Sequence, residues 1–509
     1  MCRIHIIMNE NKREMDYLGY EITKSKVISS LIWKLLERGG TQGIQFIVMI
    51  VLARHLLPKD FGLIVIVAVI ISLANVLVQC GFNAALIQKK NADELDFSSV
   101  FYLNLLVTCI LYIVLFFSAP FLASVFEQEQ LILVLRILSL TLFLGTVNAI
   151  QNAVIARNLQ FKKLFFSSLG AVVVSGIVAI LMVSANFGVW ALVGHQLINQ
   201  FLITLILWFT VKWRPQLLFS VERIKELFSF GWKMLVSSLI TTFYNNLQSL
   251  IIGKMFSPAL LGFYSRGEQF PSLIVSNVNG SIQSVMFPTL SSHQENRQRV
   301  KEMVRRSIVT SSFIIFPMMM GLAMVAEPLV EILLTEKWLP AVPFLQIFCA
   351  AYALWPIHTS NLQAINALGR SDIFMKLEII KSIIGLVVLG ISIQFGVHGM
   401  ALGIIVSGVI SIFINAYPNS KLLNYSIQEQ LKDIVPSLVL SLMMGVVVYS
   451  IHWFGMTNIA TIIIQVFVGV ALYIGLAKVF RLECFIYLVM TMQEIFKRDK
   501  SVPIEEIYE

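Results

Sequence analysis

Charged side chains are scarce in this sequence: Asp, Glu, Lys and Arg make up 13% of its 509 residues, whereas 57% of the residues are hydrophobic. A soluble domain of that composition would have too little polar surface to cover its core. Apolar runs of about 20 residues recur from end to end, which is the length that an α-helix needs to cross a bilayer. The composition therefore excludes a soluble fold and predicts an all-α polytopic membrane protein.

Cysteine is also sparse, and its placement argues against two kinds of site. The five cysteines stand singly, at Cys2, Cys80, Cys109, Cys349 and Cys484. With no Cys-x-x-Cys pair and no Cys/His cluster, the sequence supports neither a disulfide framework nor a metal site. We also find no Walker sequence and no nucleophile elbow. We therefore expect no metal, no cofactor and no catalytic residues.

The hydropathy pattern predicts about fourteen membrane spans, and the basic residues predict their direction. The spans lie at roughly residues 31–53, 61–85, 97–119, 132–153, 164–184, 188–211, 230–256, 260–288, 306–330, 341–366, 374–394, 398–418, 433–453 and 459–480. Loops and tails on the N-terminal side hold about 27 Lys and Arg, against about four on the other side, so the positive-inside rule predicts that both termini are cytoplasmic. The net charge of +9 is then explained by loops that contact anionic membrane lipids, not by nucleic-acid binding.

Three short segments recur in the same order about 200 to 213 residues later, which indicates an internal repeat. They are PKDFG at 58–62 with PALLG at 258–262, RNLQFKK at 157–163 with RSDIFMK at 370–376, and FGV at 187–189 with FGV at 395–397. Six spans per unit is an even number, so the second unit restarts in the same orientation. The sequence therefore predicts two parallel six-helix repeats around a cleft, followed by two additional helices.

The repeat and the loops define a predicted domain plan. We expect a cytoplasmic tail (1–30), an N-terminal six-helix lobe (31–212), a cytoplasmic linker (213–229), a C-terminal six-helix lobe (230–420), two additional spans (421–480) and a cytoplasmic tail (481–509). The outer loops are too short to hold a folded domain. The protein must therefore work inside the membrane, which excludes most enzyme designs.

The first span carries charged and amide residues where lipid contact would be costly. Lys34, Glu37 and Arg38 occupy its first turns, and Gln42 and Gln45 follow. A charge facing lipid costs several kcal/mol, so these side chains should face a protein interior or a water-filled cavity. The alternative is that Lys34 reaches the headgroups and pairs with Glu37. Arg38 lies deeper, and we favour a cavity role for it.

The eighth span is polar along its length. Arg266 and Glu268 lie near its outer end, and Asn277 belongs to a set of Ser, Asn and Gln residues that continues through it. This is too much polarity for a lipid-facing helix, although helix packing through small and amide residues explains most of the set. Residues two apart on a helix do not face one another, so Arg266 and Glu268 each need another partner or a ligand.

Other polar residues lie singly in predicted spans. Asn245 is in the seventh span, and Lys381 lies one to two turns inside the eleventh. His195, His358 and His398 are isolated. A lone intramembrane histidine is more often a hydrogen-bonding residue between helices than part of a proton relay.

The segments WKLLERGGTQGIQFIVMIVLARHLLPKDFG, YSRGEQFP and MFPTLSS, on a fourteen-span frame with a six-plus-six repeat, resemble a known family. It is the polysaccharide transport branch of the flippase superfamily that also contains multidrug and toxin extruders. Within that branch the chain is similar to the teichuronic acid and colanic acid exporters. The resemblance covers the chain after about residue 25.

That resemblance implies a V-shaped, two-lobe bundle in the bacterial cytoplasmic (inner) membrane. It implies a flippase, not an enzyme, that moves an oligosaccharide linked to undecaprenyl pyrophosphate to the outer leaflet by alternating access. Such a flippase would serve the synthesis of O-antigen, capsule, exopolysaccharide or teichuronic acid. Its partners would be the lipid-linked substrate, membrane lipids, and the glycosyltransferases and polymerase of the same pathway.

The resemblance also implies a site. The related flippases of lipid-linked peptidoglycan precursors carry functional arginines in their first and eighth spans, and Arg38 and Arg266 stand at matching places. Guanidinium groups make bidentate contacts with phosphate oxygens. The hypothesis is that Arg38 and Arg266 bind the pyrophosphate, while Lys34 and Lys381 add positive potential. The remaining candidates, polar cavity residues or residues for proton or sodium coupling, are Glu37, Glu268, Gln42, Asn245 and Asn277.

Three other functions stay open at this level. A multidrug or cation antiporter would need intramembrane acids, for which Glu37, Glu268 and Glu327 are the candidates. A membrane polymerase or ligase usually has a large outer loop or a soluble catalytic domain, and neither is visible. A structural scaffold fits the composition but leaves the intramembrane charges unexplained.

Overall fold

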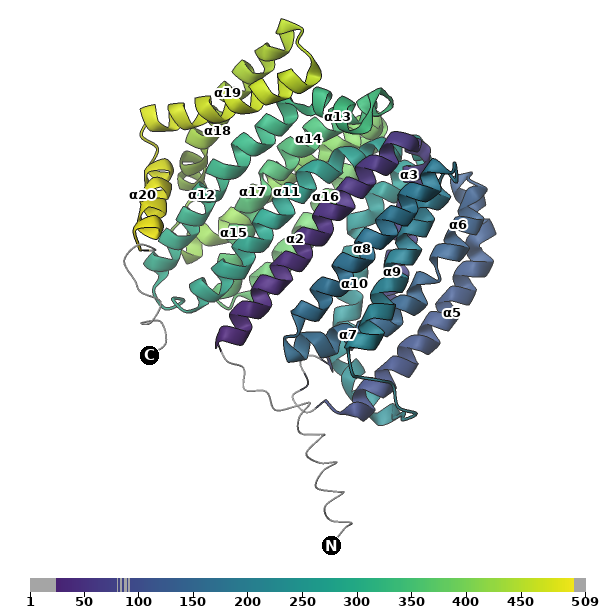
Figure 1. Ribbon diagram of the computed structural model, residues 1–509. Helices are drawn as coiled ribbons and strands as arrows, with labels where there is room; N and C mark the ends of the chain where they lie inside the picture. The colour runs from purple at the N-terminus through teal and green to yellow at the C-terminus, as the bar shows by residue number, and fades with distance from the viewer. Residues whose placement is uncertain (1–23, 80, 83–84, 87–88, 90–91, 499–509) are drawn as a thin grey trace. The chain divides into compact units, whose positions relative to one another are not determined.

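The computed structural model describes residues 24–498, apart from residues 80, 83–84, 87–88 and 90–91, and its regular structure is helical (Figure 1). Ten helical segments in the described part are long and apolar enough to cross a membrane. The predicted all-α polytopic fold is thus confirmed. Cys2, Cys80 and most of the predicted N-terminal tail lie outside the described residues.

The predicted number of fourteen spans stays a prediction. Three long helices are not among the ten because of their polar residues: α2 (Lys24–His55), α10 (Val221–Met255) and α11 (Pro258–Ser291). One of the ten segments, Ser371–Leu422, has 52 residues and contains two long helices, so it counts once although it could cross the membrane twice. These are α16 (Ser371–Ser392) and α17 (Gly396–Leu422), joined by the short 3-10 turn η2 (Ile393–Phe395).

The chain divides into two compact units, Met1–Leu261 and Gly262–Glu509. Besides α2 and α10, the first unit contains α3 (Pro58–Gln79), α5 (Glu94–Phe126), α6 (Gln130–Leu138), α7 (Thr141–Asn158), α8 (Phe161–Ser184) and α9 (Trp190–Thr210). In it α2 packs along α8, α8 packs along α9, and α3 packs against α7 and α10. One apolar core lies around Phe97, Phe101 and Trp213.

The second unit contains most of α11 and everything that follows it. Its further elements are α12 (Arg297–Met324), α13 (Ala326–Leu334), η1 (Glu336–Ala341), α14 (Val342–Ala353), α15 (Trp355–Ala367), α16, η2, α17, α18 (Ile427–Ser450), η3 (Ile451–Phe454), α19 (Asn458–Val479) and α20 (Glu483–Arg498). The two helices beyond the repeat join this unit, because α18 packs along α12 and α19 contacts α13. The amphipathic α20 was not predicted and lies in what the sequence suggested was a tail.

The first unit extends further along the chain than the predicted N-terminal lobe. It includes α10, which the domain plan assigned to the second lobe, because α10 packs on α3 and α5. The predicted lobe boundaries themselves stay a prediction.

Backbone requirements at helix starts explain why the repeated segments recur. Pro58 and Pro258 begin α3 and α11, where the missing N–H of proline costs no hydrogen bond. Gly188 (φ 56°) precedes α9, and Gly396 (φ 73°) begins α17. Glycine adopts positive φ without a steric penalty, so both copies need it at this turn.

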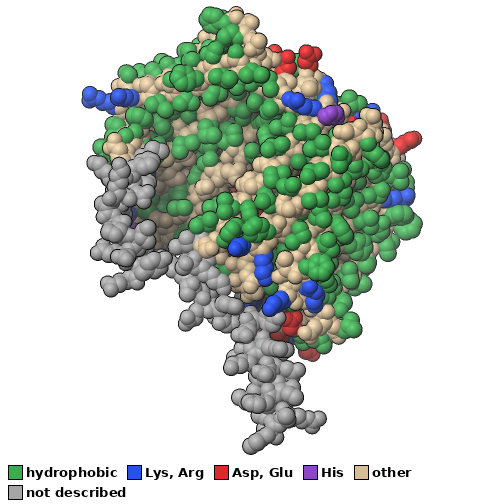
Figure 2. Space-filling view, viewed as in Figure 1, with side chains coloured by type: hydrophobic (Ala, Val, Ile, Leu, Met, Phe, Trp, Pro, Cys, Tyr) green, Lys and Arg blue, Asp and Glu red, His purple; other side chains and the backbone are tan. Residues whose placement is uncertain are grey.

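Large apolar side chains cover the outside of the helices. Figure 2 shows hydrophobic side chains over most of the visible face. In the described part of the chain, Phe117 on α5 and Phe467 on α19 are each 75% exposed. Such exposure would be costly in water and is favourable against lipid tails.

Candidate functional site

The charged residues Lys34, Glu37 and Arg38 of α2 form the site that the sequence analysis emphasised. Lys34 Nζ lies 3.2 Å from Glu37 Oε2 and 5.6 Å from the centroid of the Phe161 ring. The suggested pairing of Lys34 with Glu37 is therefore present. Lys34 remains exposed, as expected of a lysine near the end of a span.

Arg38 has a different environment from Lys34. Its side chain is exposed, and no residue in the described part of the chain forms an ion pair with it. The next residue, Gly39, leaves open space, since a Cβ added there would meet no described atom within 4 Å. Arg38 thus presents a guanidinium with all its donors available to a ligand, beside a backbone that a ligand can approach.

On α11, Arg266 and Glu268 each have their own partner. Arg266 donates to the amide oxygen of Gln269, one turn further along the helix. Glu268 Oε1 accepts a hydrogen bond of 2.5 Å from the Tyr352 hydroxyl on α14. Each of the two charged residues thus has a partner other than its neighbour two positions away, as their spacing predicted.

The other predicted site residues are spread over four helices. Lys381 on α16 is largely buried, and its Nζ lies 2.6 Å from Glu378 Oε1. Asn245 on α10 is exposed, and Asn277 on α11 donates to its own helix at Leu273 O (2.7 Å). Gln42 is half-buried on α2. The candidate site residues on α2 and α10 thus lie in unit 1, and the candidate site residues on α11 and α16 lie in unit 2. A joint pyrophosphate site stays a prediction.

The three isolated histidines also differ from one another. His358 Nδ1 lies 3.2 Å from Asn415 Nδ2, a contact between α15 and α17, as the more common alternative predicted. His398 stacks on Phe344, with ring centroids 4.5 Å apart. His195 is only 2% exposed, and neither of its ring nitrogens has a hydrogen-bond partner among the described residues.

His195 lines a polar cavity in unit 1 that the sequence analysis did not predict. The cavity measures about 260 Å³, and its wall is formed by Gln45, Met49, Asn75, Thr141, Gly145, His195, Gln196, Asn199 and Gln200. One signal was visible in the sequence: four polar residues, at 195, 196, 199 and 200, fall on one face of the sixth span.

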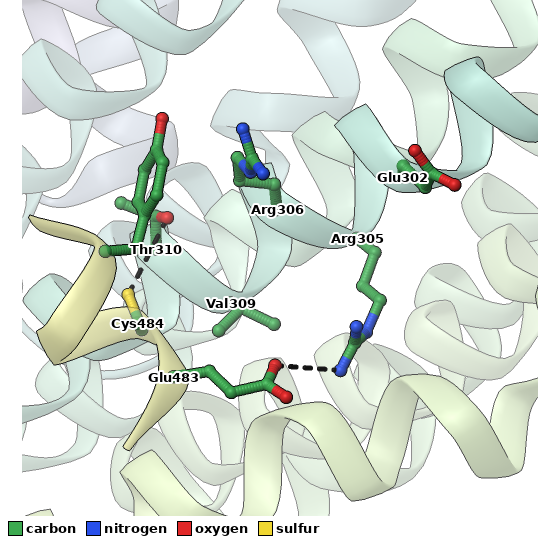
Figure 3. Close-up of a pocket in the computed structure, with 8 residues that line it drawn as sticks. Glu302, Arg305, Arg306, Val309, Thr310, Glu483 and Cys484 are labelled. Atoms are coloured by element: carbon green, nitrogen blue, oxygen red, sulfur yellow. Dashed lines mark hydrogen bonds and ion pairs between the residues drawn. The ribbon is translucent and has the colours of Figure 1, made fainter. Parts of the chain in front are cut away.

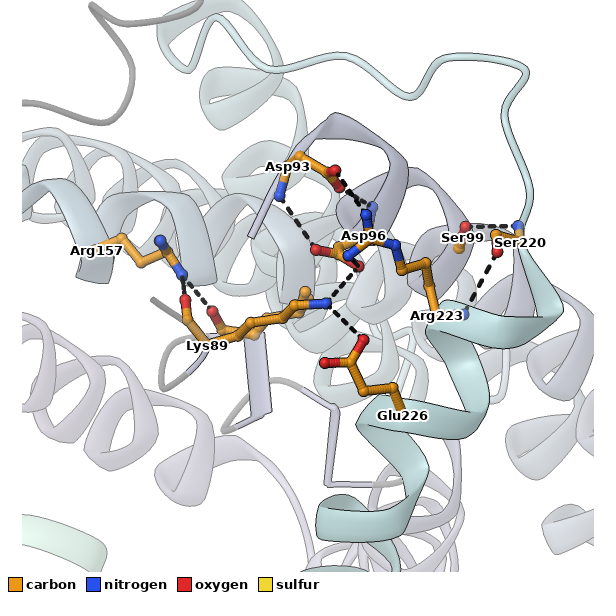
Figure 4. A network of polar contacts seen from close by, with 9 residues as sticks. Lys89, Asp93, Asp96, Ser99, Arg157, Ser220, Arg223 and Glu226 are labelled. Atoms are coloured by element: carbon orange, nitrogen blue, oxygen red, sulfur yellow. Dashed lines mark hydrogen bonds and ion pairs between the residues drawn. The ribbon is translucent and has the colours of Figure 1, made fainter. Parts of the chain in front are cut away.

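Loop residues that the sequence analysis used only to orient the chain form a polar network at one end of unit 1 (Figure 4). Lys89 Nζ lies 3.1 Å from Asp96 Oδ1 and 3.0 Å from Glu226 Oε2. Asp96 is fully buried, and Arg223 lies 3.8 Å from it. Burial alone would lower the pKa of Lys89, but its hydrogen bonds to Glu226 and Asp96 raise it.

The same network holds a loop to α7 and α10. Arg157 donates to Leu86 O (2.6 Å) and Lys89 O (2.7 Å). Ser220, the N-cap of α10, donates its backbone N–H to Ser99 Oγ (2.9 Å). These contacts tie the starts of α5 and α10 and the end of α7 together, which indicates a structural role for the network.

In unit 2, α12 and α20 enclose a pocket of about 280 Å³ (Figure 3). Arg305 lies 3.0 Å from Asp433 and 3.3 Å from Glu483. The Arg306 guanidinium lies 4.4 Å from the centroid of the Tyr487 ring. Acidic and aromatic partners thus engage both arginines, and the contacts fasten α20 to α12.

These features define a multi-pass helical membrane protein with a polar, cationic first helix. A family model described as "Polysaccharide biosynthesis protein" matches residues 51–343, which is more than half of the chain. The chain belongs to this polysaccharide biosynthesis family, and the resemblance inferred from the sequence is confirmed.

Two curated relatives are similar to the chain. The teichuronic acid biosynthesis protein TuaB of Bacillus subtilis (strain 168) is 26% identical over 303 residues, which are 59% of this chain and 62% of that protein. The chain thus spans less than two thirds of the length of TuaB. The lipopolysaccharide biosynthesis protein WzxC of Escherichia coli (strain K12) is 24% identical over 441 residues, covering 83% of this chain and 88% of that protein.

Two solved structures share the fold. The lipid II flippase MurJ, in an inward closed conformation, matches with a TM-score of 0.72 and 16% identity over 89% of this chain and 98% of that one. An inward-facing multidrug resistance MATE transporter of the MOP superfamily matches with a TM-score of 0.58 and 17% identity, over 76% and 96% of the two chains. At such identities the matches establish the fold alone.

Proposed function

We propose that this protein is a flippase that moves oligosaccharides linked to undecaprenyl pyrophosphate across the bacterial cytoplasmic membrane by alternating access. The observation that carries the proposal is the exposed guanidinium of Arg38 on α2, which forms no ion pair with a described residue, in a chain of a polysaccharide biosynthesis family. A pyrophosphate cannot enter hydrocarbon without compensation of its charge. An arginine beside an open stretch of backbone supplies that compensation with bidentate geometry.

In this proposal the cations act in two ways. Arg38 and Arg266 bind pyrophosphate oxygens, and Arg266 exchanges its hydrogen bond with Gln269 for one with the ligand. Lys34 and Lys381 contribute positive potential that Glu37 and Glu378 partly offset. The carboxylates of Glu37 and Glu268 are the candidates for proton or sodium coupling.

The surroundings of the proposed flippase follow from its substrate. Glycosyltransferases assemble the lipid-linked oligosaccharide on the cytoplasmic side, and a polymerase consumes it on the outer side. Both termini are cytoplasmic in this arrangement, in agreement with the distribution of Lys and Arg.

The second candidate is a drug or cation antiporter with the same fold. Glu268 is the residue that favours it, because its carboxylate lies inside the helical bundle of unit 2 and bonds to Tyr352. The transported species separates the two functions: in an antiporter, replacement of Glu268 by Gln abolishes the exchange of a drug or cation for an ion, whereas the flippase translocates the lipid-linked oligosaccharide.

Depletion of the protein tests the function directly. The lipid-linked oligosaccharide is labelled with a membrane-impermeant sugar-modifying reagent in intact cells and in inverted vesicles. We expect it to accumulate on the cytoplasmic face, where only the inverted vesicles are labelled. Accumulation on the outer face would instead indicate polymerisation or ligation and would contradict the proposal.

A further inference from the structure

We propose that the cavity at His195 is a subsite for an uncharged sugar residue of the transported oligosaccharide. The inference rests on the proposed function, because the subsite takes the glycan of that same substrate. Four helices contribute to the wall: Gln45 and Met49 come from α2, Asn75 from α3, Thr141 and Gly145 from α7, and His195, Gln196, Asn199 and Gln200 from α9.

The hydrogen-bonding capacity of this cavity is not met by the protein. His195 is 2% exposed, and both of its ring nitrogens and Asn199 Oδ1 are buried without a hydrogen-bond partner among the described residues. Burying such groups without partners inside a membrane span is unfavourable, so a ligand whose hydroxyl groups bond to them is stabilised there. The other two intramembrane histidines have protein neighbours: His358 contacts Asn415, and His398 stacks on Phe344.

The chemistry of the wall selects an uncharged, hydroxyl-rich ligand. Seven of the lining side chains carry groups that are able to form hydrogen bonds, namely Gln45, Asn75, Thr141, His195, Gln196, Asn199 and Gln200. No described Lys, Arg, Asp or Glu is among the lining residues, so a charged ligand would lack a counter-charge. Amides, a hydroxyl and an imidazole each donate and accept, as sugar hydroxyl groups do.

The size of the cavity agrees with one sugar ring. At about 30 Å³ per liquid water molecule, about 260 Å³ corresponds to roughly nine waters, close to the twelve or so heavy atoms of a hexose. A volume of this size matches one sugar residue better than a whole oligosaccharide.

The position of the cavity on α2 connects it to the proposed pyrophosphate contact. Arg38, Gln42, Gln45 and Met49 follow one another at helical spacing and share one face of α2. Arg38 and Gln45 are two turns apart, or roughly 10 Å along the axis. A substrate whose pyrophosphate contacts Arg38 therefore presents a nearby sugar to Gln45 and His195.

Substrate protection of an introduced cysteine tests the subsite. Asn199→Cys, purified in proteoliposomes, is labelled with a methanethiosulfonate reagent, with Gln196→Cys as a second variant in case the first does not fold. The probes are the lipid-linked oligosaccharide that accumulates in depleted cells and undecaprenyl pyrophosphate without sugar. At ten times its Kd the glycosylated lipid should slow labelling about tenfold, and the bare lipid should change it less than about twofold.

The controls are the native chain with its five cysteines, and Gln130→Cys, an exposed position outside the cavity wall. Neither lipid should alter the labelling of Gln130→Cys. Translocation of the glycosylated lipid is measured in the same vesicles. If that lipid is translocated and protects no cavity cysteine, or if both lipids protect equally, the subsite is contradicted and the flippase function stands. If it is not translocated at all, both proposals fail.

Discussion

Residues of one type have different surroundings in this protein, and the surroundings decide what each can do. Of the four cations selected from the sequence, Lys34 and Lys381 have a glutamate one turn away on the same helix, and Arg266 bonds to Gln269. Arg38 is exposed and has no ion pair with a described residue. A cation already paired with a carboxylate offers a ligand less than one whose donors are all available.

Replacing Arg38 by Ala should therefore reduce translocation of the lipid-linked oligosaccharide by about 10- to 100-fold, the loss of about 1.5–3 kcal/mol of charge-assisted hydrogen bonding. The translocation rate of Arg38→Lys should lie between the rates of the wild type and of Arg38→Ala, because lysine keeps the charge and loses the bidentate geometry. Translocation is measured in proteoliposomes at equal protein content.

Arg370→Ala is the matched control for this experiment. Arg370 is an exposed arginine at the start of α16 whose Nε lies 2.9 Å from Asp372 Oδ1. Its removal should leave translocation within about twofold, as expected for an exposed ion pair. Wild-type rates in Arg38→Ala would remove Arg38 from the site.

At the scale of helices, the chain at both ends of α3 packs closely against the backbone of other helices. A Cβ added at Gly62 would lie 1.7 Å from Pro258 O, and one added at Gly81 would lie 2.3 Å from Gly231 O. Both obstacles are backbone atoms, which no side-chain rotation can move. Gly62 therefore allows α3 to approach the start of α11, and Gly81, just beyond the end of α3, allows the chain to approach α10.

Gly62→Ala should lower the free energy of unfolding by about 3 kcal/mol, the upper end of overpacking costs. Gly475→Ala in α19 is the control, because a Cβ there meets no described atom within 4 Å. Its effect should be neutral or stabilising by up to about 1 kcal/mol through helix propensity. Thermal unfolding in detergent measures both, and equal melting temperatures would contradict the packing argument.

The polar network around Asp96 should contribute stability of its own. Asp96→Ala removes the buried carboxylate from Lys89 and should cost about 2–3 kcal/mol, while Lys89 keeps Glu226. Glu226→Ala breaks a more exposed pair and should cost less than about 1 kcal/mol. Similar losses in the two variants would show that burial does not strengthen the Asp96 contact.

The stability supplied by this network should not change between about pH 6 and pH 9. The pKa of Lys89 is raised above its ordinary value of 10.5, so its contribution is fully present below that value and is lost only as the pH rises through the raised pKa. The difference in unfolding free energy between wild type and Asp96→Ala, measured at both pH values, should therefore be equal. A smaller difference at pH 9 would contradict the assignment of Lys89 as the cation.

At the scale of the whole molecule, the proposed orientation in the membrane can be tested with fusions. A fluorescent protein that folds only in the cytoplasm should fluoresce when fused before Met1 or after Glu509. Alkaline phosphatase, which is active only outside the cytoplasm, should be active after Gln128 and inactive after Gln294. Activity after Gln294 would reverse the orientation derived from the positive-inside rule.

Several features were predictable because their causes are local in the sequence. The helical membrane fold follows from the length and composition of apolar runs. The repeat was visible because Pro58, Pro258, Gly188 and Gly396 meet backbone requirements that other residues meet poorly. The polar character of α2 and α11 was likewise evident, since the bilayer penalises each such residue individually.

Other features were decided by tertiary structure alone. The sequence could not tell that Tyr352 would bond to Glu268, that Arg223 would approach a buried Asp96, or that Lys89 would pair with Glu226, because these partners are far apart in the chain. Nor could it distinguish His195, which lines a polar cavity, from His358, which bonds to Asn415. Hydropathy and charge act between a residue and its solvent, so the sequence by itself determined the helical membrane fold and predicts which side of the membrane each loop faces. Partners and cavities arise where distant segments meet, so only the packed helices determine them.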